Sequence, residues 1–282
     1  MYGSVLTSEG VASNNRGETA GNVATIQKIL RDGEIYTTVS AEAIRYAIRE
    51  YWTRQGKQVN REISPDGNDT WNETDDFSEN EKDYLDDDVL GYMDPSEDTV
   101  KRRGRLEVSR AVSTNPWSGD VMFNVASQGA HPDSDDPSPY STEVHDTRYQ
   151  YLFALTPEQL HDTNRFEDAL NAIRDLRRVA GNHSRFLYDF SPEAIVLRWT
   201  QDPAPRMMYC FDESDEGQVS ADLLLDRIES GDIDREELYV GGSAIQHMKD
   251  RLEEEGVDVF KGIKSAFDTV KQQAQQDLDL TE

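Results

Sequence analysis

The stretch "VSAEAIRYAIREYW", residues 39–52, decides the fold, because it predicts the first strong helix of the chain. Its apolar residues recur at the spacing of one helical face, at Ala41, Ile44, Ile48 and Tyr51. Ser40 is a good N-cap, and Glu42 in the first turn suits the helix dipole. We therefore expect a helix from Ser40 to about residue 54, with Arg45 and Arg49 one turn apart on it.

Strand patterns surround this helix. Residues 2–8 precede it, residues 105–112 and 148–155 follow it, and residues 165–180 form a second helix that Gly181 is expected to end. Three more strand candidates follow, at 186–190, 194–200 and 206–211, and which of them completes the sheet stays open. Without the insertions between these elements, the order is βαββαβ, typical of an α+β fold of the ferredoxin-like or RNA-recognition-motif kind.

Charge is distributed unevenly along the chain. The 282 residues carry a formal net charge of -27, yet residues 1–61 hold eight Lys and Arg against six Asp and Glu. Residues 62–98 hold fifteen Asp and Glu against Lys82 alone, together with several turn-forming Gly and Pro residues. We interpret this acidic stretch as an insertion projecting from a mildly basic body, and Asp86, Asp87 and Asp88 as part of a solvated loop.

The composition narrows the class of protein. No apolar run approaches the ~20 residues that span a bilayer, which predicts no membrane contact and a cytoplasmic location. The five histidines show no ligand-pair spacing, so we expect neither metal nor cofactor, and Cys210 lies in an apolar pattern typical of a buried structural thiol. The acidity fits a salt-adapted host, although a basic partner or a cation-binding surface would also explain it.

Residues that suit nucleic acid lie near the first helix. Arg16 follows Asn15 in a polar loop, Lys28 sits in "TIQKIL", and Arg45 and Arg49 lie on the helix. Guanidinium groups bind phosphate bidentately, although pairing of Arg45 and Arg49 with Glu42 or Glu50 would explain them equally simply. In "NPWSGDVMF", Trp117 and Phe123 lie on a predicted hairpin, where aromatic rings either stack on bases or pack into the hairpin itself. We find no motif of a known enzyme class.

Six segments in order resemble one family. "SNNRGETAGNVATIQK", "YTTVSAEAIRYAIRE", "NPWSGDVMFN", "RYQYLFAL", "AGNHSRFLYDFSPEAIVLRWT" and "DPAPRMMY" are similar to the DevR-type backbone subunit of CRISPR type I Cascade complexes, the type I-B kind above all. The resemblance runs from the first strand to about Phe211 and continues more loosely beyond it. The chain departs from the family in its insertion, which is shorter and far more acidic.

The resemblance implies a hand-like division of the chain. The palm, of ferredoxin-like topology, would comprise residues 1–55, 105–112 and 147–215. An acidic fingers insertion would occupy 56–104, a thumb β-hairpin 113–146 and a helical C-terminal extension 216–282.

The resemblance also implies a function and a set of contacts. The chain would be a non-catalytic subunit that polymerises along CRISPR guide RNA beside other Cascade subunits and presents the guide for pairing with target DNA. By position, Asn15, Arg16, Lys28, Ser40, Arg45 and Arg49 would contact guide phosphates, Trp117 and Phe123 would lie on the thumb, and Asn182 and His183 match a loop of unassigned role.

Two other functions stay open. A type III-like backbone subunit would cut target RNA with a loop aspartate. Asp32, Asp120 and Asp133 lie in loops, but none of them has a sequence context that matches such a site. An autoregulatory protein would bind its own promoter DNA. A chain this acidic would hold RNA more by hydrogen bonds, stacking and contacts between copies than by bulk charge, because phosphate binding weakens steeply with salt.

Overall fold

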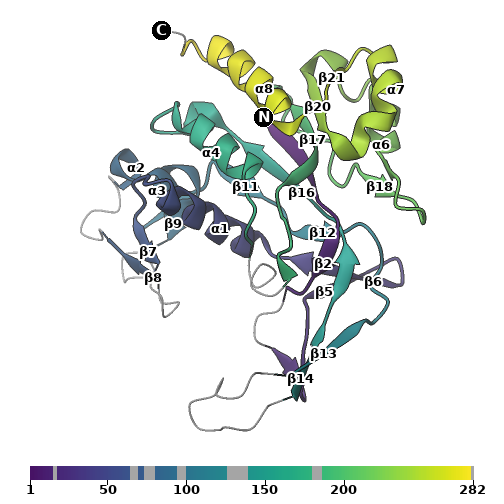
Figure 1. The fold of residues 1–282 in the computed structure, drawn as a ribbon. Helices are drawn as coiled ribbons and strands as arrows, with labels where there is room; N and C mark the ends of the chain where they lie inside the picture. Colours follow the sequence, from purple (N-terminus) through teal and green to yellow (C-terminus); the bar gives the residue numbers. More distant parts are fainter. Residues whose placement is uncertain are drawn as a thin grey trace.

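The computed structural model describes residues 1–14, 18–63, 69–72, 80–93, 100–125, 139–179 and 186–280. It is a mixed α+β fold built on one large sheet (Figure 1). In spatial order the strands are β21 (Asp258–Phe260), β20 (Leu238–Gly242), β17 (Pro192–Arg198), β1 (Tyr2–Thr7), β16 (Tyr149–Leu155), β12 (Ala111–Ser113), β6 (Glu34–Val39) and β5 (Lys28–Arg31). The short β11 (Leu106–Val108) also pairs with β16.

The centre of this sheet follows the predicted element order. β1 lies between β17 and β16 and is antiparallel to both, and β16 is antiparallel to β12. The strand that completes the centre is therefore β17, which overlaps the 194–200 candidate and begins two residues before it, whereas residues 187–190 and 206–210 form no strand. The predicted strand at 105–112 is two short strands, β11 and β12, that both pair with β16.

Alternating side chains give the sheet two buried faces. On one face, Val5, Tyr151 and Ile195 pack against α1 (Ala41–Arg54), α4 (Arg165–Arg174) and α8 (Ile263–Asp277). On the other face, Leu6, Leu152 and Val196 pack against α6 (Asp222–Glu229), α7 (Lys249–Glu254) and residues 207–211. Because successive strand residues point to opposite sides, helices can cover both faces of one sheet.

Predictions for the helices hold in part. α1 begins after Ser40, whose hydroxyl accepts a hydrogen bond from the Ala43 amide at 3.2 Å, as the N-cap prediction requires. The second helix ends at Arg174, so the predicted end at Gly181 is wrong. The C-terminal extension is not simply helical, because β20 and β21 lie between its helices and extend the main sheet through β17.

The acidic insertion is in part a folded unit beside α1. Its described elements are β7 (Arg61–Ile63), β8 (Asp69–Trp71), α2 (Asn80–Asp83), α3 (Leu85–Val89), β9 (Gly91–Met93) and β10 (Lys101–Arg103). Asp86, Asp87 and Asp88 lie in α3 and are fully buried, so their assignment to a solvated loop is wrong. They are buried because cationic and amide donors from other segments surround them.

A β-hairpin projects from the body at the bottom of Figure 1, on the side away from α8. The predicted strand 121–125 is β13 (Val121–Val125), which pairs with β14 (Pro139–Glu143). β14 also pairs with β4 (Val23–Ala24), which in turn pairs with β3 (Thr19–Ala20). β15 (His145–Thr147) pairs with β2 (Gly10–Ala12), so the N-terminal segment fastens the hairpin to the body.

The remaining elements are small. β18 (Asp212–Glu213) pairs with β19 (Val219–Ser220), and three 3-10 turns lie at Pro157–Gln159, Arg235–Glu237 and Ser243–Met248. Within the described ranges, no helix combines the length and the apolar character needed to cross a bilayer.

Candidate nucleic-acid interface

Lys28 and Trp117 meet at the base of the β13–β14 hairpin. The Lys28 ammonium lies 3.8 Å from the centroid of the Trp117 ring and 2.6 Å from a carboxylate oxygen of Glu143 on β14. Glu143 also accepts a hydrogen bond from the Ile26 amide at 2.9 Å. The sequence predicted Lys28 and Trp117 separately as candidates, and the structure brings them together although they lie 89 positions apart in the chain.

Hydrogen bonds fix the orientation of the Trp117 ring. Its indole N–H donates to the Val144 carbonyl at 2.8 Å, and its backbone amide donates to the Ile35 carbonyl at 2.7 Å. The half-buried ring therefore belongs to the base of the hairpin and supports the lysine above it. A cation held over an aromatic ring beside an exposed strand is a feature that can bind an anion and a base together.

β13 carries the most exposed apolar residues near this base. Phe123 is 67% exposed, and Val121, Met122 and Val125 on the same strand are also largely open to solvent. Phe123 therefore does not pack into the hairpin's own core, which was one of the two interpretations of the hairpin aromatics. Val121 and Val125 were not predicted as site residues. They lie two positions on either side of Phe123, which puts all three on the same face of a strand, and this spacing would have indicated them.

Other predicted contacts have structural partners. Ser40 is buried and its hydroxyl caps α1. Asn14, next to the predicted Asn15 and Arg16, is buried and donates its side-chain amide to the Thr38 carbonyl at 2.8 Å. Asn15, Arg16, Asn182 and His183 lie outside the described residues, and contact of all these residues with RNA stays a prediction.

Arg45 and Arg49 face the acidic insertion. Arg49 donates to Asp86 at 3.1 Å, and Arg45 donates to the Leu90 carbonyl. Burial, followed by the proximity of Arg49, lowers the pKa of Arg45. The carboxylate that pairs with Arg49 is Asp86, whereas Glu50, one of the two alternatives, pairs with Arg54. Both arginines thus fasten the insertion to α1, and a contact with RNA stays a prediction that this geometry does not require.

The described residues contain no group of three or more His, Cys, Asp and Glu that could hold a metal ion. Asp120 is exposed at the base of the hairpin, where it accepts a hydrogen bond from the Ser118 hydroxyl at 3.1 Å, and Asp32 occupies a turn between β5 and β6. Asp133 lies outside the described residues. Cys210 is buried, and burial raises the pKa of its thiol to about 12.

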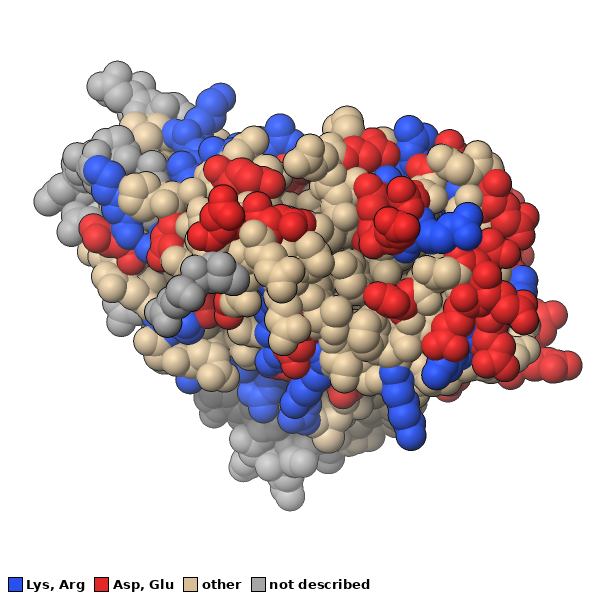
Figure 2. All heavy atoms as spheres, turned by 90° about the horizontal axis from the view of Figure 1, so that it is seen from above, with Lys and Arg blue, Asp and Glu red and all other residues tan. Residues whose placement is uncertain are grey.

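Charged side chains are distributed unevenly over the surface (Figure 2). Figure 2 shows Asp and Glu gathered at the right-hand end of the molecule, where α6 and α7 lie in Figure 1. Residues 216–282 hold seventeen Asp and Glu against seven Lys and Arg. Lys28 at the hairpin base belongs to the net positive residues 1–61, whereas residues 113–146, which include the hairpin strands, hold six Asp and Glu and no Lys or Arg. An anionic partner is therefore repelled by the C-terminal end, and near the hairpin base the favourable charge comes from Lys28.

Comparisons with known proteins point to one CRISPR-associated family. Residues 10–164 match the family model described as "CRISPR-associated negative auto-regulator DevR/Csa2". The curated "CRISPR-associated protein Cas7/Cst2/DevR" of Myxococcus xanthus (strain DK1622) is 43% identical over an alignment of 287 positions that covers 94% of each chain.

Two solved structures share the fold. One, a chain of a "CRISPR RNA-guided surveillance complex, pre-nicking", superposes with a TM-score of 0.63 at 9% identity and covers 97% of this chain and 99% of its own. Another, from a "CRISPR RNA-guided surveillance complex", gives a TM-score of 0.60 at 14% identity over 97% of this chain and 100% of its own. At these identities the likeness concerns the fold alone.

Proposed function

The chain belongs to the CRISPR-associated DevR/Csa2 family, and we propose that it is a guide-RNA-binding backbone subunit of a type I-B Cascade interference complex. In this proposal, copies polymerise along the guide in the cytoplasm beside other Cascade subunits, and the exposed bases pair with target DNA. The subunit itself is non-catalytic, and its central sheet is a palm of ferredoxin-like topology. The family membership supports this proposal, as does the fold shared with chains of CRISPR RNA-guided surveillance complexes.

One observation carries the proposal to particular residues. At the base of the hairpin a cation is held over an aromatic ring, and the adjoining strand exposes a phenylalanine at 67%. Lys28 would bind a guide phosphate, exchanging Glu143 for it, while Phe123 would insert beside a base and separate it from its neighbour.

Variants at these two positions test the proposal. Lys28→Gln and Phe123→Ala are each expressed with the other subunits and the guide, and the RNA retained per subunit is measured after purification. We expect each variant to retain several-fold less RNA than the parent, because each removes one contact per copy along the guide. The matched control is Arg54→Gln, which removes one exposed cation of α1 that pairs with Glu50. RNA retention equal to that of the control would contradict the assignment.

A second function follows from the family's description as a negative auto-regulator. If the chain regulates its own expression, it should bind its promoter duplex specifically in the absence of guide RNA. Band shifts with the promoter and with a scrambled duplex separate this function from the first. A parallel assay for magnesium-dependent cleavage of RNA complementary to the guide tests the non-catalytic assignment, and cleavage would favour a type III-like subunit.

A further inference from the structure

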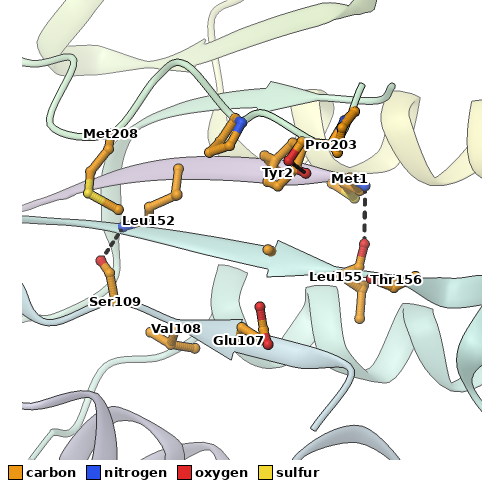
Figure 3. A pocket seen from close by; sticks show the side chains of 12 residues that line it. Met1, Tyr2, Glu107, Val108, Ser109, Leu152, Leu155, Thr156, Pro203 and Met208 are labelled. Carbon is orange, nitrogen blue, oxygen red and sulfur yellow. Dashed lines mark hydrogen bonds between the residues drawn. The ribbon is translucent and has the colours of Figure 1, made fainter. Parts of the chain in front are cut away.

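A loop crosses the second face of the sheet beside the hairpin β5–β6. This crossing segment, residues 203–211, is tied to the sheet by several hydrogen bonds. Among them, Tyr2 donates to the Pro203 carbonyl at 2.7 Å, Ser4 to that of Met207 at 2.5 Å and Gln150 to that of Phe211 at 2.9 Å. Figure 3 shows Pro203 beside Tyr2 and Met208 beside Leu152 along a cavity of about 380 Å³. The segment is therefore held in one position over the strands.

Its backbone is strained at Tyr209. Tyr209 has a φ of 55° and Arg206 a φ of 54°, in the left-handed region that side chains other than glycine seldom adopt. Such conformations persist only where the surroundings impose them, and they cluster at ligand sites. Here the strain presents the Tyr209 ring to the hairpin β5–β6, where it meets a cation.

Two arginines and two tyrosines gather at this point. The Arg31 guanidinium lies 4.7 Å from the centroid of the Tyr209 ring and 5.8 Å from that of Tyr36. Arg110 donates to the Thr38 hydroxyl at 3.2 Å, and its carbonyl accepts from the Tyr209 hydroxyl at 3.2 Å. The register of β5 and β6 puts Arg31, Tyr36 and Thr38 on the same face, opposite to that of Lys28.

The two cations have no carboxylate partner in the described part of the chain, although the chain is acidic. Most described arginines pair with carboxylates, as Arg148 does with Glu9, Glu193 and Glu213. By contrast, neither Arg31 nor Arg110 forms an ion pair with another described residue. The nearby carboxylates are Asp32 and Glu34 of the hairpin turn, whose charges also act on Tyr36. Unpaired guanidinium groups beside aromatic rings suit a ligand that carries both an anion and a planar group.

We propose that Arg31, Tyr36, Arg110 and Tyr209 form a second binding surface, for a nucleotide of a single strand. Its base stacks on the tyrosine and guanidinium planes, and its phosphate is bound by the two arginines. This inference rests on the proposed function for the presence of nucleic acid, and the strand is either the guide or the target. The surface lies on the other face of β5–β6 from Lys28, so it binds a segment of strand that passes around the sheet edge.

Photochemical cross-linking of the native complex tests the surface directly. One arm uses a guide that carries 4-thiouridine, and the other uses a complementary target strand that carries 5-bromodeoxyuridine. We expect cross-links at Tyr36 or Tyr209 from one of the two strands, and that strand is the ligand. No cross-link at either tyrosine from either strand would overturn the proposal.

Variants separate binding from a merely structural role. The double variant Arg31→Gln, Arg110→Gln should bind that strand about tenfold more weakly, with a salt slope smaller by about two. Tyr209→Leu should also weaken binding, whereas Tyr209→Phe, which keeps the ring and loses the bond to Arg110, should bind like the parent. The control Arg251→Gln removes an exposed cation of α7 that pairs with Asp222.

The outcomes also distinguish this inference from the proposed function. A complex that contains guide RNA but whose variants bind like the parent rejects the second surface alone. A complex without guide RNA rejects the proposed function, and the bromodeoxyuridine strand, added to the purified chain, then decides whether the surface binds a single strand at all. Equal binding by the parent, the double variant and Arg251→Gln rejects it there too.

Discussion

At the scale of single residues, the three aspartates of α3 show how an acidic chain can bury charge. Asp88 accepts hydrogen bonds from Arg102 at 2.6 Å and Arg165 at 2.9 Å, and Asp86 accepts from Arg49. Asp87 accepts from the Asn60 side chain at 2.6 Å, while its other carboxylate oxygen is buried without a hydrogen-bond partner among the described residues. The middle aspartate is therefore the least compensated of the three.

This difference predicts the pH dependence of stability. Burial and then the neighbouring Asp86 raise the pKa of Asp87 to about 7, while Asn60, Arg61 and Arg49 oppose the shift. Between about pH 4 and pH 7 the folded chain holds a proton that the unfolded chain has released. The stability that this proton provides is therefore complete in acid and is lost as the pH rises through that window.

Asp87→Asn should remove this dependence, which amounts to a few kcal/mol between the two limits. Urea unfolding at pH 5, 6, 7 and 8 measures this dependence. The urea concentration at the midpoint should fall less with rising pH in the variant than in the parent. Asp88→Asn is the contrasting control. It should destabilise at every pH, by about 3 kcal/mol, because it leaves two part-buried arginines beside a neutral group. An identical pH profile for parent and Asp87→Asn would contradict the account.

Residue types could be predicted better than residue partners. Lys28 and Trp117 could be proposed from the sequence because a cation suits phosphate and an aromatic ring on a hairpin can stack on bases. The partner of Arg49 was not recognisable, because Asp86 lies 37 positions away in an insertion whose composition suggested solvent. Local charge patterns indicate the i,i+4 pairs, such as Arg54 with Glu50, and say nothing about such distant ones.

At the scale of elements, long periodic segments were predicted well and their connections less well. β1, α1, β13 and β16 lie within a residue or two of their predictions, because hydrophobic alternation or a cap defines them. β20 and β21 were missed inside a segment interpreted as helical. Their short sequences, "LYVGG" and "DVF", become strands because β20 pairs with β17 and β21 pairs with β20, which no local pattern indicates.

The pairing of β20 with β17 depends on Gly242. A Cβ at this position would lie 2.1 Å from the Glu193 carbonyl oxygen, and its φ of 117° disfavours any other residue. Gly242→Ala should therefore destabilise the chain by about 3 kcal/mol or more and weaken the attachment of the C-terminal extension. Thermal unfolding measures the loss, and hydrogen exchange should show faster exchange in β20.

Gly231→Ala is the matched control. Gly231 also has a positive φ, of 73°, but a Cβ there would meet nothing within 4 Å. The expected cost is about 1 kcal/mol, from the backbone conformation alone. If the two alanine variants lose equal stability, the close approach between β20 and β17 does not contribute.

At the scale of the whole molecule, the net charge of -27 predicts a response to salt. Like charges on the surface, concentrated around α6 and α7, repel one another, and this repulsion is screened within about 10 Å at 0.1 M salt and more strongly above it. We expect the Tm of the purified chain to rise by several degrees between 0.1 M and 2 M KCl. A Tm that falls over this range, as buried and surface ion pairs weaken, would reject the salt-adapted interpretation.

The central claim is that this chain holds guide RNA as a backbone subunit, and that it does so in concentrated salt. The most direct measurement is to purify the native complex from its host in 2 M KCl and to sequence the RNA that accompanies it. The account predicts discrete repeat-spacer RNAs of uniform length in a large assembly that several copies of the chain form. An RNA-free monomer, or RNA of random sequence and length, would contradict it.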